Sequence, residues 1–186
     1  MAALTKNELI TLIKGANSVK HLNLTGADLR DLDFRGINLS GVNLSGANLS
    51  DANFRGVNLR LANLSGAILN RAKFSGAALC GANLSEASLM GACLQEANLT
   101  GADLSDTNLN RANFSGANLT LTDLTWANLE SAILKGANLS GAELWDVKLF
   151  HADFSGANLS GANMDKRSLC YTTRDLNLKG LNLLKS

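Results

Sequence analysis

Residues 37–46 read Ile-Asn-Leu-Ser-Gly-Val-Asn-Leu-Ser-Gly, and this five-residue pattern runs without interruption from His21 to Cys170. A large apolar residue recurs every fifth position from Leu24 to Leu169, and these 30 positions hold 24 Leu, five Phe and one Met. Ala stands two residues before this position in 21 of the 30 units, and Asn or Asp stands one residue before it in 21. A fixed short period indicates one small structural unit stacked on itself.

The period fits neither an α-helix nor a long β-strand, because apolar residues do not recur at 3.6 or at 2 positions. The large apolar residue and the Ala are two positions apart, so a short extended segment directs both to the same face. Gly permits sharp turns, and Asn or Asp side chains hydrogen-bond nearby backbone at a turn. The pattern therefore predicts a coil that turns once per unit around a core of Leu and Ala.

The phenylalanines at the large apolar position indicate how many units make one coil. Their positions all differ by multiples of 20, which happens about once in 256 times if four sides are filled at random. Four units then make one coil of 20 residues, and the rings stack on one side of the interior. This predicted structural core consists of Phe34, Phe54, Phe74, Phe114 and Phe154.

The repeated Ala-(Asn/Asp)-(Leu/Phe)-x-x pattern resembles the pentapeptide repeat family over residues 21–170. The resemblance implies an all-β solenoid, a right-handed quadrilateral β-helix of about eight 20-residue coils. A weaker echo of the pattern, Asp175 to Leu184, follows after a break near residues 166–174. The repeat residues of this family are architectural, so the resemblance predicts the fold and leaves function to be argued from the surface.

Both ends of a solenoid need a cover, because an open edge invites pairing. Thr5 and Glu8 have the spacing of a capping box, so residues 1–20 are expected to form a short capping α-helix and a linker, with the helix over about 6–14. The β-helix occupies 21–170. Residues 171–186 are either a C-terminal cap or a final irregular coil. Several members of the family dimerise through this end, which implies a homodimer here.

Composition narrows the possible functions. The chain has 186 residues, 17 Lys plus Arg and 16 Asp plus Glu, so the net charge of +1 attracts neither nucleic acid nor a membrane surface. No apolar run is long enough to span a membrane. Three cysteines, an odd count at unrelated spacings, are consistent with reduced thiols and a cytoplasmic protein.

The sequence predicts no catalysis. A close-packed rod offers no cleft in which catalytic groups converge. The two histidines, His21 and His151, lie near opposite ends of the repeat, so neither a His-based metal site nor a catalytic triad is expected. The glycines follow the five-residue period and form no phosphate-binding loop. We expect a non-enzyme without cofactor, metal or catalytic residue.

Three outward aromatic residues interrupt the pattern. Trp126, Trp145 and Phe150 take positions that normally hold Ser, Thr or Gly, and they fall around one corner in the sixth and seventh coils. Three such rings are enough for an interaction patch. The alternative is that the rings lie flat on neighbouring loops.

Charged residues form two further outward groups. Asp103, Asp123 and Glu143 fall in one column on successive coils, where they face a basic partner, hold Ca²⁺ weakly, or form a solvated acidic side. Arg35 and Arg55 form a basic column, which Asp31 and Asp51 at the adjoining corner are expected to neutralise. Nucleic-acid binding is therefore not expected.

The sequence as a whole predicts a structural or protein-interaction scaffold that presents an aromatic–acidic surface to an unknown protein partner. The alternative known from the family is a DNA-mimicking protector of DNA gyrase, which should be acidic along most of its length. A third class is a surface binder of carbohydrate or ions. The net charge and the arginines of the first half disfavour the gyrase reading.

Overall fold

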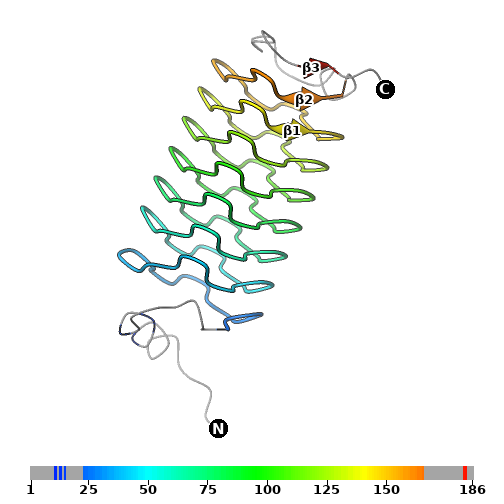
Figure 1. Ribbon diagram of the computed structural model, residues 1–186. Helices are drawn as coiled ribbons and strands as arrows, with labels where there is room; N and C mark the ends of the chain where they lie inside the picture. The colour runs from blue at the N-terminus through cyan, green and yellow to red at the C-terminus, as the bar shows by residue number, and fades with distance from the viewer. Residues whose placement is uncertain (1–10, 12, 14, 16–22, 166–181, 184–186) are drawn as a thin grey trace.

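The chain winds into a stack of similar coils (Figure 1). The structure is a computed structural model, and it describes residues 11, 13, 15, 23–165 and 182–183. Isolated parallel bridges join residues 20 positions apart, from Asn23↔Asn43 to Asn138↔Asn158. Three short strands continue this pairing as one parallel sheet in the order β1-β2-β3, with β1 at Glu143–Leu144, β2 at Asn163–Met164 and β3 at Asn182–Leu183. The protein is an all-β solenoid with four five-residue units in each coil.

Hydrogen bonds between coils hold the stack together. The N–H of Leu64 donates to the carbonyl of Asn83 one coil later at 2.7 Å, and the N–H of Asn63 donates to Val42 one coil earlier at 2.9 Å. The same two bonds recur along the coils, so each side of a coil is a very short parallel strand. Proline lacks the N–H that these bonds need, which explains why the chain contains none.

Every unit ends in a tight corner. The N–H of Ala47 donates to the carbonyl of Leu44 at 3.1 Å across Ser45 and Gly46, and Gly46 has φ of 64°. Gly46 is the third residue of this type II turn, the position at which such a turn requires positive φ. Every fifth residue from Gly26 to Gly161 has positive φ, and 13 of these 28 corner residues are not glycine. Those 13 adopt a conformation that costs an L-residue roughly 1–2 kcal/mol.

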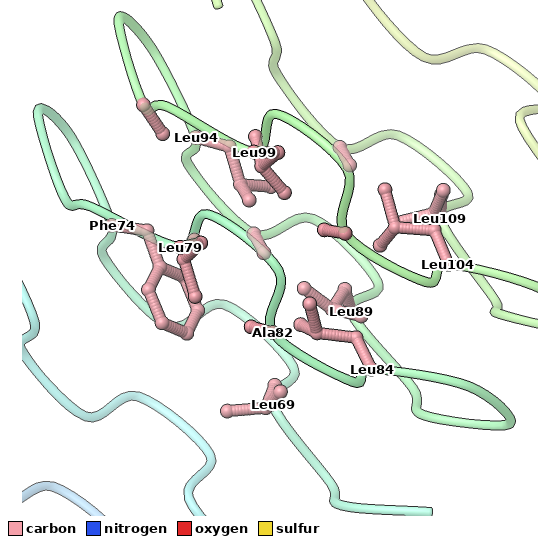
Figure 2. Packing of buried hydrophobic residues seen from close by; sticks show 14 of the residues in the cluster. Leu69, Phe74, Leu79, Ala82, Leu84, Leu89, Leu94, Leu99, Leu104 and Leu109 are labelled. Atoms are coloured by element: carbon pink, nitrogen blue, oxygen red, sulfur yellow. The ribbon is translucent and has the colours of Figure 1, made fainter. Parts of the chain in front are cut away.

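The interior is filled by the large apolar residue and the small residue two positions before it, as Figure 2 shows for Phe74 and its neighbouring leucines. The five phenylalanines at the large apolar position are at most 1% exposed. The Phe54 ring stacks on Phe34, with centroids 4.7 Å apart, and on Phe74 at 4.8 Å. Phe114 has leucine at the same position in both neighbouring coils, Leu94 and Leu134, and Phe154 has Leu134 in the preceding coil.

Polar residues at the edge of the core are satisfied. Thr107 and Thr122 replace Ala, and the hydroxyl of each donates to the carbonyl three residues earlier, at 2.8 Å for Thr122. Among the described residues, no buried side-chain nitrogen or oxygen lacks a hydrogen-bond partner. The core therefore tolerates threonine at the small position.

The Asn before the large apolar residue closes the corner. Oδ1 of Asn118 accepts the N–H of Thr120 at 3.1 Å and its hydroxyl at 2.6 Å. The same bond recurs along the coils, as in Asn43 to Ser45 and Asn138 to Ser140. Where Ser88 replaces Asn, the N–H of Met90 is instead bound by Oδ1 of Asn70, from the preceding coil, at 3.0 Å.

The two ends are described only in part. Thr11, Ile13 and Gly15 are helical and Ile13 is buried, while the rest of the expected capping helix over 6–14 lies outside the described residues. At the other end, Asn163 pairs with Asn182, which is 19 residues later, so the last described pairing is one residue shorter than the others. The rest of 171–186 is outside the described residues. No helix in the described ranges is long and apolar enough to cross a membrane.

Candidate functional site: the aromatic–acidic corner

Trp126 occupies a corner position with φ of 60°, and it is 59% exposed. Because residues 20 apart lie in one column, Asp106 precedes it by one coil and Asp146 follows it by one coil. Glu86 lies one coil further back. These three acidic residues are also exposed and also have positive φ. Trp126 therefore lies between two carboxylates along one edge of the solenoid, at a coil rise of about 4.8 Å.

Trp145 lies next to Trp126 on the following coil. The N–H of Trp126 donates to the carbonyl of Trp145 at 2.8 Å. The ring of Trp145 is fixed, because its Nε1–H donates to Oε2 of Glu143 at 2.9 Å, and it is half-buried. Asn163 donates through Nδ2 to both oxygens of Glu143, at 2.8 and 2.9 Å. Trp126 is consequently the more accessible of the two rings.

Phe150 lies one unit beyond Trp145, at the next corner of the same coil. It is 51% exposed, and its ring centroid is 3.9 Å from that of His151. Within residues 23–165, neither tryptophan ring stacks on another aromatic ring. The structure thus brings Trp126 and Trp145 together through the backbone and places Phe150 one side away.

The acidic column of Asp103, Asp123 and Glu143 is bridged from coil to coil. Two of its carboxylates accept hydrogen bonds from the corners that follow them. Oδ1 of Asp103 accepts hydrogen bonds from the N–H and the hydroxyl of Ser105, and Oδ1 of Asp123 accepts one from the N–H of Thr125 at 2.9 Å. All three residues are half-buried. In the part of the chain that the structure describes, no group of three or more His, Cys, Asp or Glu is arranged to hold a metal ion.

The acidic residues in the column of Trp126 differ from Asp103, Asp123 and Glu143 in their hydrogen bonds. The carboxylates of Glu86, Asp106 and Asp146 form no ion pair and accept no hydrogen bond within the described residues. The 20-residue period is the sequence signal that identifies Asp106 and Asp146, because they lie 20 residues before and after Trp126. Together these residues form the aromatic–acidic corner, which consists of Glu86, Asp103, Asp106, Asp123, Trp126, Glu143, Trp145 and Asp146.

Half of the six basic residues in residues 23–80 form ion pairs with described residues, namely Arg30, Arg35 and Arg71. Arg35 binds Asp33 at 2.7 Å, not Asp31 as expected, because Asp33 belongs to the same corner. Asp51 binds Arg71 at 2.6 Å and not Arg55, which forms no ion pair with a described residue. The hydrogen bond to Asp33 raises the pKa of the Arg35 guanidinium, and the hydrogen bond from Arg71 lowers the pKa of Asp51. These pairs reduce the free positive charge of this surface.

A small cavity of about 260 Å³ lies on another corner, where Gly91 leaves space between Arg71 and Arg111. Asn70, Met90 and Asn110 complete its lining. Asp51 pairs with Arg71, so Arg111 alone among the described residues of this lining adds an unpaired positive charge, and none of them is aromatic. The aromatic–acidic corner remains the stronger candidate.

Charge is divided along the rod. Residues 81–165 contain ten carboxylates and three basic residues, a net charge of −7, whereas residues 23–80 contain four carboxylates and six basic residues, a net charge of +2. The aromatic–acidic corner lies within the acidic part. The overall charge of +1 conceals this division.

Comparison with known proteins agrees with this architecture. The sequence matches the family described as pentapeptide repeats (8 copies) over residues 23–60, 58–95, 97–136 and 127–165. The matches cover most of the chain, and the chain belongs to the pentapeptide repeat family. Members of this family are in general non-enzymatic structural or interaction proteins. A comparison with curated proteins gives no match.

Several solved structures are similar to this chain, among them three that differ in organism or role. HetL, a pentapeptide repeat protein involved in regulation of heterocyst differentiation from the cyanobacterium Nostoc sp. strain PCC 7120, is 34% identical, with a TM-score of 0.46 over 88% of this chain and 82% of HetL. The protein alr5209 from Nostoc PCC 7120 is 38% identical, with a TM-score of 0.51 over 55% of this chain and 84% of alr5209. QnrB1, a plasmid-mediated fluoroquinolone resistance protein, is 25% identical, with a TM-score of 0.43 over 86% of this chain and 81% of QnrB1.

Proposed function

We propose that this protein is a non-enzymatic scaffold that binds a protein partner through the aromatic–acidic corner. The observation that carries the proposal is Trp126, a large apolar side chain that is 59% exposed and held at positive φ. Bulky residues rarely adopt this conformation, and 15 of the 28 corner residues are glycine. Leu61 and Leu121 share the exposure and the positive φ, but of the three only Trp126 is aromatic and lies between acidic residues in its column, which is the reason to infer a functional contact there.

The surroundings of Trp126 support a protein as the partner. Tryptophan is enriched among the residues that dominate binding energy at protein interfaces. Trp145 is held in place by Glu143 and Asn163, so part of the surface is preorganised before binding.

The half-buried thiols of Cys80 and Cys93 are free, and we place the protein in the reducing cytoplasm.

The test is the capture of partners from the native source with two matched variants. Trp126→Gly removes the ring and installs the residue most common at corners. Leu121→Gly is the control, because Leu121 is also at positive φ and is 65% exposed, but lies at the preceding corner. We expect Trp126→Gly to lose partners that wild type and Leu121→Gly retain, with all three proteins folded by circular dichroism. Capture of the same partners by Trp126→Gly would remove the proposal.

The second candidate function is DNA-mimicking protection of DNA gyrase. The net charge of −7 over residues 81–165 favours it, and the net charge of +2 over residues 23–80 disfavours it, because a mimic needs a continuous acidic surface. We expect no inhibition in a gyrase supercoiling assay. Inhibition at micromolar protein would place this function above the general scaffold.

We also propose a homodimer through the C-terminal end. β3 is the last strand of the described sheet, and a terminal strand is a natural site for pairing with a second chain. Light scattering measures the mass in solution directly. A monomeric mass at high protein concentration excludes the dimer.

A further inference from the structure

We propose that the partner presents a basic segment to the aromatic–acidic corner, with an arginine or lysine side chain stacked on the exposed ring of Trp126. This inference rests on the proposed function and adds the chemistry of the partner. It depends on three observations: the position of Trp126 between two carboxylates, the lack of bonds to those carboxylates, and the charge of the surrounding coils.

The first observation concerns geometry. Asp106 and Asp146 lie in the column of Trp126, one coil before and one coil after it. A cation is attracted to the face of a tryptophan ring, and the planar guanidinium of arginine can stack on a ring while it donates hydrogen bonds to a carboxylate. At a coil rise of about 4.8 Å, one arginine can reach both the ring and a flanking carboxylate.

The second observation concerns what these carboxylates already bind. Asp103, Asp123 and Glu143 accept hydrogen bonds from their own corners or neighbouring coils. Asp106 and Asp146 accept none within the described residues, although their backbone N–H groups are bonded. Their charge is therefore available to a partner, and a charge-assisted bond to it is stronger than a neutral one.

The third observation concerns the nearby charges. Lys148 is exposed on the adjoining side, and Arg111 lies at the next corner, but the ion pairs of the described residues include neither of them. With a net charge of −7, residues 81–165 attract a basic segment and repel an acidic one. Charge complementarity thus favours a basic protein segment over an acidic one as the occupant.

The chain provides a direct reporter of this contact. Its only two tryptophans are Trp126 and Trp145, so tryptophan fluorescence reports on the corner alone. The probe is a synthetic peptide of alternating arginine and glycine, compared with lysine–glycine and glutamate–glycine peptides. We expect the arginine peptide to change the fluorescence at the lowest concentration and the glutamate peptide to have no effect. Raising the ionic strength should weaken the binding, because exposed charges are screened.

Variants assign the contact, with affinities measured by isothermal titration calorimetry. Trp126→Gly is expected to weaken binding of the arginine peptide about threefold to tenfold. Asp106→Gly is expected to weaken it about threefold, and Asp106→Gly with Asp146→Gly about tenfold. The control is Asp31→Gly, because Asp31 is also a corner acid at positive φ but lies at the far end of the described coils. It should leave the affinity unchanged.

Each result is decisive. Equal binding of the arginine and glutamate peptides, or equal effects of Asp31→Gly and Asp106→Gly, overturns the inference. If Trp126→Gly loses its cellular partner while the arginine peptide does not bind wild type, the interaction surface stands and the basic partner fails alone. If wild type self-associates through this corner and Trp126→Gly does not, the occupant is a second copy and the inference also fails. If Trp126→Gly keeps its cellular partner, the proposed function itself fails.

Discussion

The corner residue is the position at which individual side chains most affect this fold. Leu61 and Leu121 are exposed residues at positive φ, and each lies over a glycine one coil later. A Cβ built on Gly81 would lie 2.9 Å from Cδ2 of Leu61, and one on Gly141 would lie 2.8 Å from Cδ2 of Leu121. A large corner side chain therefore restricts the residue that follows it in the column.

This restriction predicts a difference between two glycine substitutions. Gly66→Ala meets no atom within 4 Å and should cost about 1 kcal/mol from positive φ alone. Gly81→Ala should cost more, because its Cβ also meets Leu61. Urea unfolding measures the cost of positive φ and the cost of the contact with Leu61. The proteins compared are the two single variants and Gly81→Ala in a Leu61→Gly background. The excess cost of Gly81→Ala should disappear in that background, and its persistence would contradict the contact.

The carboxylate of Asp153, which accepts hydrogen bonds from the corner that follows it, predicts a dependence of stability on pH. The hydroxyl and the N–H of Ser155 donate to Asp153 and lower the pKa of its carboxyl below 3.8. The stability from this ionised group is complete above the unfolded pKa and is lost as pH falls through the folded one. Asp153→Asn keeps the acceptor without the titration. Its melting temperature should match wild type at neutral pH and fall less steeply below about pH 4. If the melting temperatures of wild type and Asp153→Asn fall equally between neutral pH and pH 2, the carboxylate of Asp153 does not have this role.

At the scale of the element, the coil combines a core of fixed size with corners of variable composition. The stack of Phe34, Phe54 and Phe74 shows how the core repeats, because the rings are nearly parallel, with interplanar angles of 2° and 5°. Phe114 has no aromatic neighbour at the same position, since residues 94 and 134 are leucine. Two phenylalanines in the same place in the coil thus differ only in what lies above and below them.

The stack predicts unequal costs for one substitution. Phe54→Leu loses two stacked ring pairs, each worth about 0.5–1.5 kcal/mol beyond burial, whereas Phe114→Leu loses none. Phe54→Leu should therefore lower the free energy of unfolding by about 1–3 kcal/mol more than Phe114→Leu. Denaturant unfolding of both variants checks this. Equal losses would mean that ring stacking adds nothing to burial here.

The sequence predicted the regular part of the fold and less of the site. The five-residue period and the spacing of the phenylalanines indicated the inner face and the 20-residue coil, because core geometry repeats strictly. The hydrogen bond that Trp145 donates to Glu143 was not predicted, and neither was the one that the N–H of Met90 donates to Asn70 of the preceding coil. The first depends on two side-chain rotamers within one coil and the second on an Asn side chain that reaches the next coil, and periodicity specifies neither. The roles of Trp126, Trp145 and Phe150 in binding stay predictions.

At the scale of the whole molecule, each coil contacts only its neighbours, so stability is approximately a sum of coil and interface terms. Removal of residues 61–80 deletes one complete 20-residue coil and leaves every later residue in its column. This variant should unfold cooperatively with a smaller denaturant dependence, and it should keep the affinity of wild type for the arginine peptide. Loss of cooperative unfolding, followed by circular dichroism, would show that the coils are not interchangeable.

Because the bridges join residues 20 positions apart, the length of an insertion or deletion decides which way the later side chains face. Loss or duplication of 20 residues preserves the direction in which every later side chain faces, but loss or duplication of five turns all of them by a quarter of a revolution. The core accepts either change, because each side of the coil is lined by the same pair of large and small residues. Two binding surfaces on one such rod can therefore be re-aimed relative to each other in evolution by a single short insertion, with no core residue replaced.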